Sequence, residues 1–337
     1  GWYSKDILSG GSFADLSGQT GCVFYDEKND MPCGYLPVSY PQWTEGEKYV
    51  LLSDRYDVWR FTPDGSEAVN LTAGEGRRTK TNYAVTRLVR PDNPYLYSNP
   101  RELPLAEPAY LTAFGEEDMR NGFARTSLTV PAAPAGFLAE KSYSGVYAKG
   151  DFRNPMDLYF TRDDWRTETR LSDINPQQDG YLWGDVQLVS WDAYDGTPLK
   201  GLLYTPENLD PSKKYPMMIY FYEISSNTLY DYYSPAPSRS IINIPFYVSR
   251  GYVVFVPDIV YETGHPGESA YNCICAGAEA MCDRFSFIDR SRMALQGQSW
   301  GGYQTAYLVT RTDMFAAAGA GAPVGNMTSA YGGIRWE

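Results

Sequence analysis

The pattern of apolar residues changes near Trp183, and this change limits the possible folds more than any other feature of the sequence. Before Trp183, short apolar runs alternate with turn signals, as in residues 48–52, 57–61 and the Pro-Asp-Gly turn at 63–65. After it, longer connections separate the apolar runs, which include residues 186–189, 199–204, 217–222, 252–256, 293–295 and 316–320. The later runs are unbroken, as in strands buried on both faces of a parallel sheet.

Two domains follow from this change. Residues 1–183 are predicted to form an antiparallel all-β domain, and residues 184–337 an α/β domain with a doubly wound, mostly parallel sheet. Helices are expected at residues 269–284 and 302–311, between the apolar runs. The length of 337 residues, with 43% hydrophobic and 21% charged residues, is sufficient for two cores.

The first domain contains weak internal repeats. The phrase at residues 56–72 is echoed at 156–172 and more faintly at 121–138, which suggests repeated propeller blades. Because the spacing of the repeats is uneven, the repeats alone support a β-sandwich and a β-propeller about equally. Only three or four blades would fit, whereas propellers are built from about 4 to 8 blades. A propeller in this part of the chain would therefore be partial.

Composition excludes several classes of function. The formal charge of −12 and the lack of a basic run argue against nucleic acid, and no apolar stretch approaches the roughly 20 residues of a membrane helix. One histidine and no CxxC pair leave a metal site without ligands, and no cofactor is expected. Cys22 and Cys33 could close a disulfide, whereas Cys273, Cys275 and Cys282 are interpreted as core thiols.

One motif carries chemistry. Gly297-x-Ser299-x-Gly301 lies between an apolar run and a helix-forming segment, as a nucleophile elbow requires. The small residues on either side of the serine let the backbone segments pass closely while the hydroxyl is held at the edge of the sheet. The backbone N–H of Trp300, at the start of the helix, would then face the oxyanion formed during acyl transfer.

Around this motif, residues 297–308 together with the flanking segments 288–290, 315–318 and 321–324 resemble the nucleophile region of the prolyl oligopeptidase family, particularly its dipeptidyl-aminopeptidase-like bacterial members. The resemblance implies the last blades of a β-propeller followed by an α/β-hydrolase domain. Residues 214–222 resemble the family segment that carries an oxyanion-binding tyrosine, so the resemblance assigns this role to Tyr222. It also implies peptide substrates and Ser299 as the nucleophile.

The sequence departs from the family pattern at the triad. An α/β-hydrolase places its acid and histidine after the serine, but the 38 residues after Ser299 contain no histidine. His265 precedes the serine in a Gly-Pro-Gly turn and is interpreted mainly as a loop residue, and Asp313 as a solvated or capping residue. The triad Asp and His are therefore expected to be absent, the hydrolase domain truncated, and residues 1–337 alone inactive.

The remaining expectations come from the family. Trp300, Val324, Met327 and Tyr331 would line the pocket for the residue before the cleaved bond, with core packing as the alternative for each. Possible partners besides peptides are a second copy of the chain or the missing C-terminal segment as a separate piece, and a periplasmic or secreted location is favoured. The alternative functions are an esterase on the same fold and a catalytically inactive, peptide-binding propeller protein.

Overall fold

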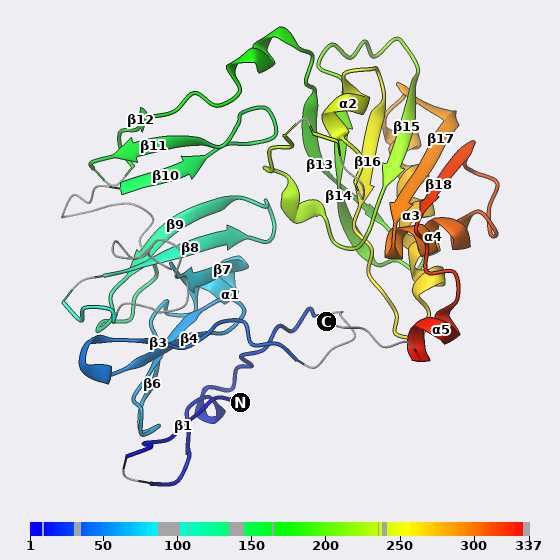
Figure 1. The fold of residues 1–337 in the computed structure, drawn as a ribbon. Helices are drawn as coiled ribbons and strands as arrows, with labels where there is room; N and C mark the ends of the chain where they lie inside the picture. The colour runs from blue at the N-terminus through cyan, green and yellow to red at the C-terminus, as the bar shows by residue number, and fades with distance from the viewer. Residues whose placement is uncertain are drawn as a thin grey trace. The chain divides into compact units, whose positions relative to one another are not determined.

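The computed structural model of the protein describes residues 1–332, except residues 9, 30–34, 87–101, 107, 135–144, 164, 235 and 238–240. The chain divides into two compact units, drawn in Figure 1. The first comprises Gly1–Gly145 and Thr161–Glu168, and the second Val146–Phe160 and Thr169–Glu337. The two units have separate hydrophobic cores.

The first unit consists of antiparallel sheets. Its three sheets have the strand orders β1-β2, β3-β4-β5-β6 and β7-β8-β9. The elements are β1 (Tyr3–Ser4), β2 (Ala14–Asp15), η1 (Gly18–Thr20), β3 (Gln42–Trp43), η2 (Glu45–Glu47), β4 (Val50–Ser53), β5 (Val58–Phe61), β6 (Ala68–Asn70), α1 (Glu75–Thr79), β7 (Thr81–Val85), β8 (Ala109–Gly115) and β9 (Asn121–Thr126). β4 and β5 alternate their apolar side chains between two cores, with Leu51 and Val58 in one and Val50, Leu52 and Phe61 in the other.

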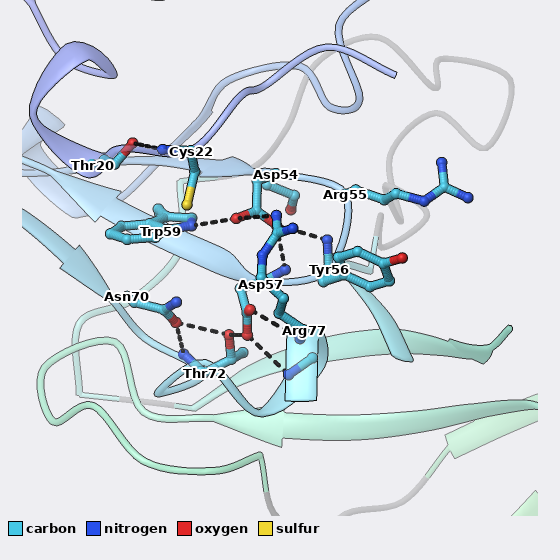
Figure 2. Close-up of polar contacts among 12 residues, drawn as sticks. Thr20, Cys22, Asp54, Arg55, Tyr56, Asp57, Trp59, Asn70, Thr72 and Arg77 are labelled. Atoms are coloured by element: carbon cyan, nitrogen blue, oxygen red, sulfur yellow. Dashed lines mark hydrogen bonds and ion pairs between the residues drawn. The ribbon is translucent and has the colours of Figure 1, made fainter. Parts of the chain in front are cut away.

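Two buried aspartates organise the turn between β4 and β5 (Figure 2). Asp54 accepts hydrogen bonds from the Asp57 amide at 2.7 Å and from the Trp59 indole at 3.0 Å. Asp57 accepts from the Thr72 hydroxyl at 2.6 Å and from the amides of Gly76 and Arg77, at the start of α1. A carboxylate in this position satisfies amides that the first turn of a helix leaves without partners. The aspartates therefore fix the connection between the strands and α1.

The second unit contains a three-stranded and a six-stranded sheet. The three-stranded sheet consists of β10 (Gly145–Lys149), β11 (Asp157–Thr161) and β12 (Thr169–Arg170), and η3 (Pro176–Gly180) follows it. The six strands have the order β13-β14-β16-β15-β17-β18, antiparallel from β13 to β16 and parallel from β16 to β18. They are β13 (Asp185–Asp192), β14 (Pro198–Thr205), β15 (Tyr215–Tyr220), β16 (Val253–Pro257), β17 (Ile288–Gln298) and β18 (Ala317–Gly321). The helical elements are η4 (Ser226–Thr228), α2 (Ile244–Val248), α3 (Pro266–Arg284), α4 (Trp300–Leu308) and α5 (Met327–Gly332).

The core of the second unit lies between the six-stranded sheet and α3. Phe255 on β16 and Ile274 on α3 are fully buried in one cluster. All five residues of β16 are buried, as the unbroken apolar run predicted. Cys273 and Cys275 are buried free thiols, which confirms their interpretation, and burial raises the pKa of Cys275 to about 12.

The predicted α/β arrangement is confirmed, since each apolar run after Trp183 overlaps a strand of the six-stranded sheet and both predicted helices form. No closed barrel is present among the described residues of the first unit, and its propeller nature stays a prediction. Cys33 lies outside the described residues, so the pairing with Cys22 is not addressed. In the described part of the chain, no helix is long and apolar enough to cross a bilayer.

The segment before the six-stranded sheet is fastened to it by polar contacts. The Trp183 indole donates to the Phe152 carbonyl at 2.6 Å, and the Arg153 guanidinium pairs with Asp185 and Glu207. These contacts explain why residues 146–160 group with the second unit. The predicted domain boundary between residues 183 and 184 stays a prediction.

Candidate functional site

The candidate site is built on the sharp turn at Ser299. β17 ends at Gln298 and α4 begins at Trp300, so one residue separates strand from helix. Ser299 has φ 58° and ψ −109°, a conformation that non-glycine residues rarely adopt and that costs about 1–3 kcal/mol. Its amide donates to the Gly321 carbonyl at the end of β18 at 2.9 Å. The surrounding structure therefore holds the serine in a strained conformation.

Two glycines make this turn sterically possible. A Cβ atom at Gly297 would lie 2.1 Å from the Gly301 carbonyl oxygen, and one at Gly301 would lie 2.4 Å from the Phe221 carbonyl oxygen. Neither distance is compatible with a side chain, because both obstacles are backbone atoms. The close approach also places the first turn of α4 against the end of β15. The GxSxG spacing thus has the structural context that the sequence predicted.

The groups predicted to bind an oxyanion converge on the same edge of the sheet. β15 and β17 are parallel neighbours with Tyr220 opposite Gln296, so Tyr222 and Ser299 both follow the carboxyl ends of adjacent strands. The Tyr222 residue is 41% exposed. The Trp300 amide is in the first turn of α4, where helix amides lack intrahelical acceptors. Ser299 is half-buried, and its hydroxyl makes no hydrogen bond to any residue that the structure describes.

A hydrogen-bonded network connects the Tyr222 backbone with the Trp300 side chain. The Tyr261 hydroxyl donates to the Tyr222 carbonyl at 2.8 Å and accepts from the Trp300 indole N–H at 3.0 Å. The fully buried Gln304 amide donates to the Tyr222 carbonyl at 3.1 Å and to the Tyr261 hydroxyl. Tyr261 therefore touches the chain segments of both predicted oxyanion donors.

A buried carboxylate holds the loop that follows Tyr222. Asp258 accepts hydrogen bonds from the amides of Ser225 and Ser226 at 2.7 and 2.8 Å and from the Ser226 hydroxyl at 2.5 Å. Burial raises the pKa of Asp258 above its ordinary value, although these three hydrogen bonds act in the opposite direction. Asp258 directly follows β16, which places it at the same edge of the sheet as Tyr222.

The structure does not bring the other predicted residues into a described contact with Ser299. Val324 lies between β18 and α5, and Met327 begins α5. Tyr331 belongs to α5, but its side chain is outside the described residues. His265 precedes α3 as an exposed residue, with Nδ1 4.0 Å from Glu268, and Asp313 is exposed beyond the end of α4.

One hollow of the second unit lies apart from the candidate site residues. A cavity of about 970 Å³ is lined by residues that include Trp183, Phe246 and Arg250, and by none of the candidate site residues. Among the residues that the structure describes, no group of three or more His, Cys, Asp and Glu side chains is arranged to hold a metal ion.

Comparison with known families bears directly on this part of the chain. Residues 237–336 match the family model described as "Prolyl oligopeptidase family". This stretch is therefore similar to the prolyl oligopeptidase family. The resemblance stated from the sequence is confirmed, and the matched stretch contains the Ser299 turn, Asp258, Tyr261 and Gln304.

Known dipeptidyl peptidases are similar to longer stretches of this chain. Human dipeptidyl peptidase 8 is 30% identical over 186 residues, which cover 49% of this chain and 19% of the relative. The probable dipeptidyl-aminopeptidase B of Penicillium rubens is 25% identical over 329 residues, which cover 90% of this chain and 33% of the relative. The chain thus spans between about a fifth and a third of these relatives.

Solved structures with a similar fold include Porphyromonas gingivalis dipeptidyl peptidase 4, with a TM-score of 0.59 and 17% identity over 84% of this chain and 41% of that one. Pyrococcus horikoshii acylaminoacyl peptidase gives a TM-score of 0.56 and 16% identity over 88% of this chain and 47% of that one. At these identities the similarity concerns the fold alone. It agrees with the α/β-hydrolase fold predicted for the second unit.

Three residues of the network were missed by the sequence interpretation: Asp258, Tyr261 and Gln304. Their hydrogen bonds join positions 32 to 82 residues apart in the chain. No local pattern reports such distant contacts. One signal was available, because Asp258 is a charged residue placed directly after a wholly apolar strand, where the active sites of α/β sheets gather their polar groups.

Proposed function

We propose that the full-length protein containing this sequence is a serine peptidase that cleaves short peptides by acyl transfer, with Ser299 as the nucleophile. The single observation that carries the proposal is the strained Ser299 between β17 and α4, within the GxSxG spacing that an elbow requires. The family match of residues 237–336 and relatives named as dipeptidyl peptidases support this reaction. Release of dipeptides from a peptide N-terminus is the proposed mode.

The proposed reaction has two halves. The Ser299 oxygen attacks the carbonyl carbon of the scissile bond, its proton passes to a general base, and the C–N bond breaks as the amine leaves with a proton. Water then hydrolyses the resulting ester and restores the serine. The Tyr222 hydroxyl and the Trp300 amide would donate hydrogen bonds to the oxyanion that forms in each half. The base is not assigned to a described residue, because His265 is exposed at the start of α3.

Several finer assignments belong to the same proposal. Residues 1–183 would be the last blades of a propeller that limits access to short peptides, and residues 184–337 the nucleophile-bearing part of the hydrolase domain. Trp300, Val324, Met327 and Tyr331 would form the pocket for the residue that precedes the cleaved bond. The antiparallel sheets of the first unit support the first of these assignments.

The test uses the full-length protein and its Ser299→Ala variant. Both are incubated with a fluorophosphonate probe, which labels activated serines, and with chromogenic Xaa-Pro and Xaa-Ala dipeptide substrates. We expect labelling and peptide turnover by the unsubstituted protein, and a loss of about 10³-fold or more in the variant, because no nucleophile remains. Residues 1–337 alone are expected to turn over little substrate.

Other outcomes select among the alternatives. Turnover of esters but not of peptides would support an esterase on the same fold. A full-length protein that binds peptides but is not labelled would support a binding protein in which the serine has lost its role. Turnover that survives Ser299→Ala would refute the assignment of the nucleophile.

A further inference from the structure

The residues just after β16 contact the Tyr222 loop at both of its ends. Asp258 holds the amides of Ser225 and Ser226, and Tyr261 holds the carbonyl of Tyr222 itself. The two contacts are made from one short segment, which is itself fixed because the Asp258 amide donates to the Lys200 carbonyl on β14 at 2.9 Å. The loop is thus attached to the centre of the six-stranded sheet, since β14 and β16 are paired.

The hydroxyl of Tyr261 makes three hydrogen bonds. It donates its one hydrogen to the Tyr222 carbonyl, and it accepts from the Trp300 indole and from the Gln304 amide. The side-chain amide of Gln304 donates one hydrogen bond to the Tyr222 carbonyl oxygen and one to the Tyr261 hydroxyl oxygen. These contacts lie behind the carbonyl of Tyr222, whose residue remains 41% exposed, so they orient the backbone and leave the phenol accessible.

One buried atom of this network lacks a hydrogen-bond partner, which suggests that Gln304 has a role other than stability. The Oε1 atom of Gln304 is buried without a hydrogen-bond partner among the described residues. Burying an amide oxygen without a partner is unfavourable, so this side chain is a poor choice for stability alone. A preorganised hydrogen-bond donor, in contrast, needs its backbone held by neighbouring groups. Gln304 gives that support to the Tyr222 carbonyl.

We propose that Tyr261 and Gln304 are positioning residues that act through Tyr222: they hold its backbone so that its hydroxyl is aimed at the oxyanion of the reaction at Ser299. The inference rests on the proposed function, because it gives the hydroxyl of Tyr222 a role only if acyl transfer takes place there. Asp258 fixes the far end of the same loop. None of the three side chains is required to contact the substrate.

A double-mutant cycle on the full-length protein tests this inference, with kcat and KM measured on a chromogenic dipeptide substrate. The variants are Tyr261→Phe, Tyr222→Phe and the combination. Tyr261→Phe removes one oxygen and is expected to lower kcat about 10-fold with KM changed less than about twofold, because a misaimed donor weakens transition-state binding. In the Tyr222→Phe background the same substitution is expected to change kcat less than about twofold.

Two further variants control the cycle. Tyr252→Phe removes a hydroxyl from the half-exposed tyrosine just before β16, at the opposite end of the strand from Tyr261, and is expected to keep kcat unchanged. Gln304→Met removes the amide and its partnerless oxygen together, and is expected to lower kcat about threefold in the unsubstituted background only. If Tyr261→Phe does not fold, as judged by thermal unfolding, the Gln304→Met cycle gives the answer.

The outcomes separate the inference from the proposed function. Equal losses of kcat from Tyr261→Phe in both backgrounds would overturn the inference, because a role confined to stability or packing is additive. An unchanged kcat in Tyr222→Phe, with activity abolished by Ser299→Ala, would also overturn it while leaving the nucleophile in place. Activity that survives Ser299→Ala would refute the proposed function itself.

Discussion

Asp57 in the first unit and Asp258 in the second make nearly the same set of hydrogen bonds. Each is a buried carboxylate that accepts two backbone amides and one hydroxyl: Asp57 from Gly76, Arg77 and Thr72, and Asp258 from Ser225 and Ser226. They differ in what they hold. Asp57 fastens the start of α1 to a strand (Figure 2), whereas Asp258 fastens a loop that carries a proposed oxyanion donor. The same set of hydrogen bonds therefore holds the start of a helix in one unit and a loop in the other.

The surroundings of the two carboxylates also differ. Beside Asp57, the Arg77 guanidinium lies 3.5 Å from Asp54, so a cation belongs to the cluster in the first unit. Around Asp258, burial outweighs the hydrogen bonds and raises the pKa of the carboxyl. The positive charge of Lys200, which lowers the pKa of Asp258, does not offset this burial.

Of the substitutions that test this comparison, Asp258→Ala in the full-length protein is expected to have the largest effect. The change leaves two buried amides and a hydroxyl without their acceptor, which we expect to lower the free energy of unfolding by about 2–4 kcal/mol. It also releases the Tyr222 loop, so kcat per folded molecule should fall about 10-fold or more. Denaturant unfolding and active-site titration with the fluorophosphonate probe measure the two effects separately. An unchanged kcat would contradict the proposal that Asp258 holds the Tyr222 loop for the reaction.

Asp57→Ala is the matched substitution in the first unit. It removes the acceptor for the first turn of α1 and for Thr72, so we expect a loss of about 1–3 kcal/mol in the free energy of unfolding. The kcat of the molecules that remain folded should not change, because Asp57 is part of the first unit's fold. A fall in kcat equal to that of Asp258→Ala would show that the two carboxylates do not differ in role.

The pH dependence of stability should distinguish Asp258 from an isosteric amide. Because the pKa of Asp258 is raised in the folded chain above its ordinary value of 3.8, the folded state binds this proton more tightly than the unfolded state. Its contribution to stability is present below pH 3.8 and is lost as the pH rises through the folded pKa. The free energy of unfolding of the unsubstituted protein relative to Asp258→Asn is therefore expected to decline through that window and to be level above it.

The smallest effect is expected from Arg77→Gln. The Arg77 side chain is 46% exposed and its ion pair with Asp54 is long, so water screens it. We expect a change of less than about 1 kcal/mol in the free energy of unfolding, decreasing further in high salt. A larger change, insensitive to salt, would mean that the cation, and not the set of hydrogen bonds, accounts for the stability of the cluster in the first unit.

The sequence predicted the parts of the fold that depend on local pattern. Unbroken apolar runs located the six strands of the second unit, and the small residues around Ser299 located its turn, because both signals lie within a few neighbouring residues. The repeats of the first unit were too uneven to establish a propeller. The role of Tyr222 came from a family resemblance and stays a prediction, although the residue follows β15, the parallel neighbour of β17.

The network behind the site could not be predicted in the same way. Tyr261 is one of 29 tyrosines, and its position gives no sign that its hydroxyl reaches Tyr222. Gln304 lies on a helix whose buried face is otherwise made of small and apolar residues, where a glutamine is normally exposed. Such contacts arise when parallel strands bring distant segments to one edge of a sheet, and only the folded chain reveals which side chains meet there.

The backbone conformation of Ser299 has a consequence for the evolution of such a chain. Glycine adopts a positive φ at little cost, so the position would be easier to fold with the hydroxymethyl group removed altogether. Selection for thermal robustness alone would push this codon toward glycine, and only a continuing demand for the alcohol would oppose that drift. The proposed role of Ser299 as the nucleophile would explain why this position holds a serine.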